Sequence, residues 1–112
     1  MGYQTTAKTD VDSVIPGEAG GMWFLKAPLG TEHLGVTVLE LEPGAEGQEH
    51  DEADSGQEEV YYVVEGKVDV DMGEETVTLS ADEAIRLDPD TTRKLHNHGD
   101  ERAKLVLAGA PL

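Results

Sequence analysis

Residues 58–66 read EEVYYVVEG, and this segment decides how the chain folds. Valine and tyrosine fill five of its nine positions and a glycine ends it, a pattern typical of a β-strand followed by a tight turn. Because neighbouring residues of a strand point to opposite faces, Tyr61 and Tyr62 are expected on opposite sides of the sheet. The preceding residues 44–57 read GAEGQEHDEADSGQ, an acidic loop that contains one histidine, His50.

Alternation between apolar and polar residues indicates further strands on both sides of this segment. In residues 67–72, KVDVDM, valine alternates with aspartate, so one face of the strand is expected to be buried. Turns rich in glycine, proline and aspartate separate such runs. Many short antiparallel strands of this kind predict an all-β sandwich or barrel. The strands that we predict cover residues 22–26, 34–42, 58–65, 67–72, 76–80, 83–87, 93–97 and 103–108.

One segment is compatible with a helix as well as with a strand. In SADEAIRL, residues 80–87, Glu83 follows Ser80 by three residues, which is the pattern of a helix capping box. Pro89 would end such a helix after about two turns, and so short a helix is unstable on its own. We therefore favour a strand over residues 83–87.

The chain of 112 residues has the size of one domain. We divide it into an N-terminal arm, residues 1–20, able to add an edge strand, and a barrel domain, residues 21–112. The sequence has no cysteine, which excludes disulfide bonds, thiolate ligands and thiol catalysis. It also has no apolar run of 18 or more residues, so we expect a soluble, cytoplasmic protein without a membrane span.

Charge is the strongest signal in the composition. Aspartate and glutamate number 24 against 8 lysines and arginines, for a formal net charge of −16. Nucleic acids and anionic membranes are polyanions, so neither is an expected partner. Molar salt shortens the Debye length to about 3 Å and suppresses the self-repulsion of such a surface. An acidic coat therefore favours a halophilic origin, with an ordinary acidic protein as the alternative.

A wider pattern around these strands resembles the cupin superfamily of small conserved β-barrels. Its first motif is written G-x5-H-x-H-x3,4-E-x6-G, and its second is written G-x5-P-x-G-x2-H-x3-N. Here Gly44 is followed after five residues by His50, and Glu59 is followed after six residues by Gly66. The resemblance covers roughly residues 34–107. It implies an antiparallel cupin β-barrel of the double-stranded β-helix or jelly-roll type.

The first motif departs from the family pattern at its metal ligands. In the family, two histidines and a glutamate of the first motif and a histidine of the second usually hold a divalent metal ion. Here Glu52 stands at the second histidine position, and six residues separate it from Glu59 where the family has three or four. Counting backward from Glu59 would put Glu52 and Asp54 at the histidine positions. We favour the register with His50, because the first glycine of the motif sets it and residues 53–56, ADSG, read as a loop insertion.

The second motif departs further, because Arg93 stands at its histidine position with Asn97 after three more residues. Arginine cannot ligate a metal, since it stays protonated and has no free lone pair. If Arg93 and Asn97 face inward, the neighbouring His96 and His98 face outward. A buried Glu59 needs a partner of opposite charge. An ion pair between Glu59 and Arg93, in the place of a metal, is therefore one expected arrangement.

The resemblance leaves a metal-dependent function open. His50, Glu52 and Glu59 would then hold one divalent ion in an open site rich in oxygen ligands. Such ligands suit manganese, iron or zinc. If the protein is an enzyme, the resemblance implies a metal-dependent reaction of the oxygenase, isomerase or lyase type.

A metal-free binding or sensing module is the alternative to this metal-dependent function. Arg93 would then replace the metal, because its planar fork can hold a carboxylate or a phosphate. Tyr61 and Asn97 are further candidates for contact with a ligand. In both cases we expect a small polar or anionic ligand inside the barrel. We also expect a homodimer, since family members often pair through an edge strand.

Overall fold

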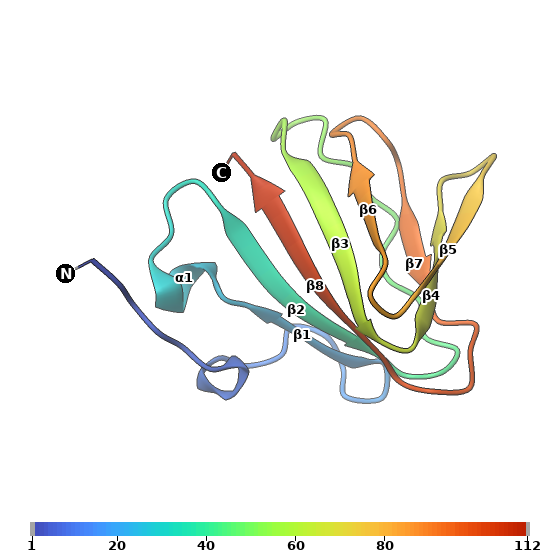
Figure 1. Cartoon of the computed structure of the whole chain (residues 1–112), viewed down its shortest axis with the longest axis horizontal. Helices are drawn as coiled ribbons and strands as arrows, with labels where there is room; N and C mark the ends of the chain where they lie inside the picture. The colour runs from blue at the N-terminus through green and yellow to red at the C-terminus, as the bar shows by residue number, and fades with distance from the viewer. Residues whose placement is uncertain (1, 112) are drawn as a thin grey trace.

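The computed structural model describes residues 2–111, which fold into eight strands, one short α-helix and one 3-10 turn (Figure 1). No helix among these residues is long and apolar enough to cross a membrane. The short helices are η1 (Lys8–Asp10) and α1 (Lys26–Leu29). The strands are β1 (Gly20–Phe24), β2 (Gly35–Leu41), β3 (Glu58–Glu65), β4 (Lys67–Asp71), β5 (Thr76–Ser80), β6 (Ala84–Leu87), β7 (Lys94–His96) and β8 (Ala103–Ala110).

The strands form two antiparallel sheets that enclose one core, which confirms the all-β prediction. The larger sheet has the order β1-β2-β8-β3-β6, and the smaller sheet has the order β5-β4-β7. Figure 1 shows the two sheets as the two walls of the barrel. The core residues come from both sheets and are mainly leucine and valine: Leu39, Leu41, Tyr61, Val63, Val68, Val70, Leu79, Leu87, Leu95, Ala103, Leu105 and Leu107.

Strand alternation divides the larger sheet into an inner and an outer face. Leu39 pairs with Leu105, which also pairs with Val63, and all three are buried in the core. The next register row carries Trp23 and Tyr62, and Tyr62 is 40% exposed. Trp23 therefore lies on the outer face. Its ring covers Gly21, where an added Cβ would lie 2.0 Å from the indole.

The structure corrects the first predicted strand and decides between helix and strand at residues 83–87. The strand predicted over residues 22–26 ends at Phe24, and Lys26 begins α1 instead. The chain turns there because Gly30, at φ 68°, closes the turn with hydrogen bonds from its N–H to the carbonyls of Lys26 and Ala27. At residues 83–87 the strand prediction is confirmed as β6. The Ser80 N–H does donate to Glu83 Oε1 at 2.7 Å, but this bond closes a turn between β5 and β6.

Candidate metal and ligand site

The acidic loop before β3 runs antiparallel to β7 and extends the smaller sheet. Backbone hydrogen bonds join Gly44 to Asn97, Gly47 to Leu95, and His50 to Arg93 in both directions, at 3.0 and 2.9 Å. His50 and Arg93 therefore stand directly opposite each other. The register that we favoured from the first glycine of the motif places His50 against the chain position where the family has its second-motif histidine.

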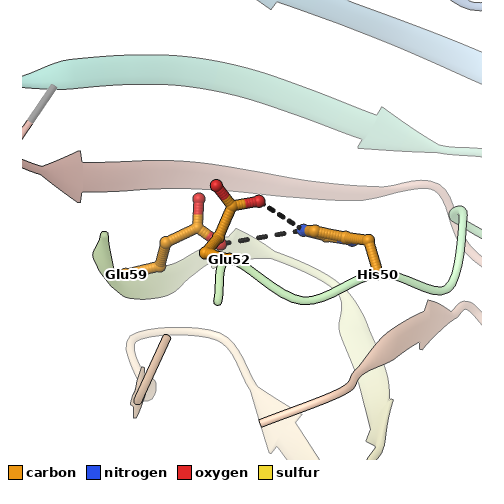
Figure 2. Close-up of side chains that lie close together, drawn as sticks. All are labelled: His50, Glu52 and Glu59. Carbon is orange, nitrogen blue, oxygen red and sulfur yellow. Dashed lines mark ion pairs between the residues drawn. The ribbon is translucent and has the colours of Figure 1, made fainter. Parts of the chain in front are cut away.

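Three acidic and imidazole side chains converge inside the barrel (Figure 2). The His50 Nε2 atom lies 3.6 Å from Glu52 Oε2 and 3.8 Å from Glu59 Oε1. One ligand atom from each residue lies within 4.8 Å of the others. His50 and Glu52 come from the loop, whereas Glu59 comes from β3 and shares the inner face with Tyr61. The three candidates for metal ligation are thus brought together by β3 and by the loop that precedes it, which is held against the β7 segment.

Arg93 forms an ion pair with Glu59 through its Nη2 atom, as the sequence suggested. Its side chain has no exposed surface, and its other nitrogens are also occupied. Nη1 donates to the Thr91 carbonyl at 2.7 Å, and Nε lies 3.4 Å from Tyr61 Oη. Burial alone would lower the pKa of the Arg93 guanidinium, but the hydrogen bonds with Tyr61 and Glu59 outweigh burial and raise it. The guanidinium is charged, and each of its three nitrogens has a hydrogen-bond partner within the protein.

Tyr61 joins this group from the buried face of β3. Its Oη donates to Glu59 Oε1 at 3.2 Å. Burial raises the pKa of the Tyr61 phenol to about 12, so the hydroxyl stays protonated near neutral pH. Tyr62 points to the opposite side, as predicted, and donates to Asp82 at 2.8 Å. Tyr61 is the inward-facing tyrosine and the one that meets the acidic group.

Two cavities meet at this group of side chains. One has a volume of about 430 Å³ and is mainly apolar, and we call it the apolar cavity. The other has a volume of about 470 Å³ and is likewise mainly apolar, but Glu52 and Glu59 are in its lining, and for these two carboxylates we call it the polar cavity. Both are lined by Met22, Phe24, His50, Tyr61 and Leu107. The predicted site residues therefore lie at the junction of the two cavities.

Comparison with known protein families identifies the family of the chain. The profile of the cupin domain matches residues 37–109, from β2 to the end of the barrel. The chain belongs to the cupin family. This match includes the loop with His50 and Glu52, the strand with Glu59, and the turn that carries Arg93.

Relatives of this cupin agree on the fold. A protein of Streptomyces cyaneus named Polyketide synthase CurC is 39% identical over 79 residues, which are 70% of this chain and 49% of that protein. The chain thus spans about half the length of this curated relative. A protein with a double-stranded β-helix domain from Klebsiella pneumoniae superposes with a TM-score of 0.77 at 19% identity, covering 96% of this chain and 89% of that one. A predicted oxalate decarboxylase from Thermotoga maritima gives a TM-score of 0.77 at 17% identity, covering 96% and 99%.

The distances from His50 Nε2 to the two carboxylates are close to those expected around a divalent ion. Two ligand atoms that are each about 2.1 Å from one ion lie about 3.0 Å apart at right angles and about 3.4 Å apart in a tetrahedron. The observed separations from His50 Nε2, 3.6 and 3.8 Å, need only a small contraction to reach these values. One imidazole and two carboxylates suit manganese, iron or zinc. The adjoining Arg93 opposes binding, because its positive charge shares the Glu59 carboxylate.

Asn97 lies away from the two cavities, although the sequence made it a candidate for ligand contact. Its amide nitrogen donates to the carbonyls of Leu41 at 2.9 Å and Glu101 at 2.8 Å, and its Oδ1 accepts from the Gly99 N–H at 3.0 Å. The residue has no exposed surface. These bonds tie the turn after β7 to the end of β2, which is a structural function.

Replacing Asn97 with alanine is expected to lower the free energy of unfolding by about 2–4 kcal/mol, because one buried and two partly buried backbone groups lose their partner. Denaturant unfolding measures this change. His98→Ala is the matched control, since the adjacent His98 side chain is 60% exposed and should change stability by less than about 0.5 kcal/mol. Equal effects of the two variants would contradict the structural role of Asn97.

His96 and His98 lie outside the barrel cavities, in agreement with the expectation that they face outward. Their rings are 3.5 Å apart on the smaller sheet. His98 Nε2 lies 3.3 Å from Asp69, and His96 Nδ1 lies 3.7 Å from Glu46.

The apolar residues of the cavities were not predicted from the sequence, because Met22 and Phe24 belong to no motif.

Proposed function

We propose that this cupin binds one divalent metal ion through His50, Glu52 and Glu59 and holds a small molecule in the adjoining barrel cavities. The observation that supports the proposal best is the convergence of three ligand atoms within 4.8 Å at the junction of the two cavities. A metal there would act as a Lewis acid toward an oxygen atom of the small molecule. Metal ligands and bound molecule would then be neighbours.

The side chains around the three ligands have separate functions in this proposal. His50 and Glu52 bind the ion from the loop, and Glu59 binds it from β3. The Tyr61 hydroxyl holds the Glu59 carboxylate by donating to Oε1, and it stays protonated because burial raises the pKa of its phenol. Arg93 fixes the same carboxylate and reduces its negative charge. This neutralisation predicts a weaker metal site than one with a histidine at position 93.

The relative from Streptomyces supports one class of small molecule. Its name, Polyketide synthase CurC, makes a polyketide-derived compound a candidate for the molecule bound here. The match covers half of that protein, and we extend to this chain only the class of compound.

A metal-free binding module is the second candidate function. It is favoured by the ion pair of Arg93 with Glu59, which gives this carboxylate a positively charged partner without an ion. In that case the protein binds its small molecule through the Glu59–Arg93 pair and Tyr61. Metal content of the purified protein separates the two candidates.

Replacing His50 with alanine is expected to abolish metal binding, with an affinity loss of at least about 100-fold, since one of three ligands is removed. Elemental analysis of untagged protein, purified in molar salt and reloaded with manganese, iron or zinc, measures the metal per chain. The matched control is His33→Ala, because His33 lies in a turn with 86% of its side chain exposed. Less than about 0.2 metal ion per chain in the unmodified protein after reloading would favour the metal-free module.

A further inference from the structure

We propose that the molecule bound by this cupin is uncharged and mainly apolar, with an oxygen-bearing group at one end, in place of the small polar or anionic ligand suggested by the sequence. The inference rests on the proposed use of the barrel as a ligand site. It does not depend on the metal, because its evidence comes from the cavity walls and from the partners of the charged groups.

The walls of the apolar cavity are the first observation. The strands contribute the side chains of Leu39, Leu41, Leu95 and Leu107 to it, and these residues are at most 9% exposed. Its volume of about 430 Å³ is within the range of about 300–1,000 Å³ for pockets that bind small molecules. An apolar body is favoured here, because a polar one would lose its hydration without finding hydrogen-bond partners on these leucines.

The N-terminal segment adds more apolar side chains to the lining of the apolar cavity. Val14, Ile15, Pro16 and Ala19 line it, although they precede β1. Hydrogen bonds to Met22 of β1 hold this segment in place, from the Val14 N–H to the Met22 carbonyl at 2.9 Å and from the Met22 N–H to Ser13 Oγ at 3.0 Å.

Apolar surface also remains exposed at the same cavity. Val14 is 54% exposed and Phe24 is 49% exposed. Both line the apolar cavity, so an apolar ligand would cover part of this surface and gain from its removal from water.

The charges at the junction disfavour an anion. The two carboxylates of Glu52 and Glu59 face the polar cavity, and Lys26 is the cation in its lining. Arg93 lines the apolar cavity, but its nitrogens are directed to Glu59, Thr91 and Tyr61. A ligand carboxylate or phosphate would have to displace the Glu59 carboxylate from a buried ion pair. An uncharged hydroxyl or keto oxygen meets no such repulsion.

The position of the polar groups indicates which end of the ligand carries its oxygen-bearing group. His50 and Tyr61 line both cavities, so they stand where a molecule lying in the apolar cavity would present one end. The His50 ring can form a hydrogen bond with an oxygen-bearing group there, and the Tyr61 oxygen, whose proton is given to Glu59, can accept one from a ligand hydroxyl. The geometry therefore points to an amphipathic molecule, with an apolar body against the leucines and an oxygen-bearing end at His50 and Tyr61.

Fluorescence of the neutral apolar probe N-phenyl-1-naphthylamine tests this inference on metal-free protein. We expect saturable binding with a Kd below about 20 µM. The neutral alcohol 2-naphthol should displace the probe, whereas glucuronate and inorganic phosphate should not. Displacement by the two anions at lower concentrations than 2-naphthol would overturn the inference, as would the absence of saturable probe binding.

Two variants place the probe within the apolar cavity. Ala19→Trp puts a bulky ring into the cavity, while the Ala19 backbone keeps its bonds to Pro16 and Glu42. It should weaken probe binding by at least about 10-fold. The matched control is Val60→Trp, on the outer face of β3, where Val60 is 39% exposed. Equal probe affinity in the two variants would overturn the assignment to this cavity.

A third variant tests the same cavity in case Ala19→Trp does not fold. Val14→Asp adds a charge to an exposed residue of the cavity lining and should also weaken the probe by about 10-fold, without a change in the unfolding transition. Unchanged binding in Val14→Asp would count against the inference. Failure of this inference can be distinguished from failure of the metal proposal, because probe binding is measured without metal and metal content is measured without the probe.

Discussion

Replacing Arg93 with methionine is expected to lower the free energy of unfolding by about 3–5 kcal/mol, because it leaves the Glu59 carboxylate without its charged partner. The Arg93 side chain has no exposed surface, and the Glu59 side chain is 16% exposed, so water cannot fully replace the lost contact. The Thr91 carbonyl also loses a hydrogen bond of 2.7 Å. Denaturant unfolding at neutral pH measures the change.

A double variant separates the lost ion pair from lost packing. Adding Glu59→Gln to Arg93→Met removes the unpaired charge, so the double variant should be more stable than Arg93→Met alone. Arg86→Met is the matched control, since the Arg86 side chain is 66% exposed and should change stability by less than about 1 kcal/mol. A loss below about 1 kcal/mol in Arg93→Met, or no recovery in the double variant, would show that the pair does not carry this energy.

The same variant reports on metal binding. If His50, Glu52 and Glu59 hold a divalent ion, adding metal to Arg93→Met should restore stability, since a ligand that binds the folded state shifts the equilibrium toward it. The ion would take the place of the guanidinium beside Glu59. In the metal-free module, divalent ions should not stabilise this variant beyond their effect on Arg93→Met carrying His50→Ala.

The strands of the barrel could be predicted from the sequence because their signal is local. Residues of β4 alternate between buried valine and aspartate, and β3 alternates around Tyr61 and Val63. The first-motif glycines bound the loop and the strand, so the approach of His50 to Glu59 followed from a known family pattern. The turn at α1 escaped prediction, because a helix of four residues has too little sequence to differ from a strand end.

The character of the cavity could not be predicted from the sequence, because its walls come from distant segments. Val14 and Ile15 belong to the N-terminal segment, yet they line the cavity together with Leu95. Phe24 lines both cavities, whereas its neighbour Trp23 lies on the outer face under Lys8, whose Nζ is 4.2 Å from the ring centre.

The hydrogen-bond partners of Arg93 likewise could not be predicted, because they depend on the fold. A sequence can show that an arginine is present. The carbonyl of Thr91 and the hydroxyl of Tyr61 that partner it appear only after folding. From the sequence, Arg93 could pair with Glu59 or hold an anionic ligand, and its contacts in the structure are those of the ion pair.

Replacing Arg93 with histidine is expected to raise the affinity for a divalent metal by about 100-fold or more, the largest gain that one substitution offers here. The change removes a positive charge and supplies a neutral nitrogen ligand opposite His50, whose backbone pairs with that of Arg93. A divalent ion and a unit charge about 6 Å apart repel by about 5 kcal/mol at an effective dielectric constant of about 20. If solvent screens half of this energy, its removal alone accounts for about 100-fold.

Competition with a fluorescent chelator measures the zinc and manganese affinities of Arg93→His and the unmodified protein. The gain should vanish when Glu52→Gln accompanies Arg93→His, because Glu52 supplies a ligand atom 3.6 Å from the His50 nitrogen. His98 is 60% exposed and lies outside the barrel cavities, so His98→Ala in the Arg93→His background should leave the affinity unchanged. A gain that survives Glu52→Gln would mean that the new histidine binds metal elsewhere. Equal affinities of Arg93→His and the unmodified protein would mean that the arginine does not limit metal binding at this site.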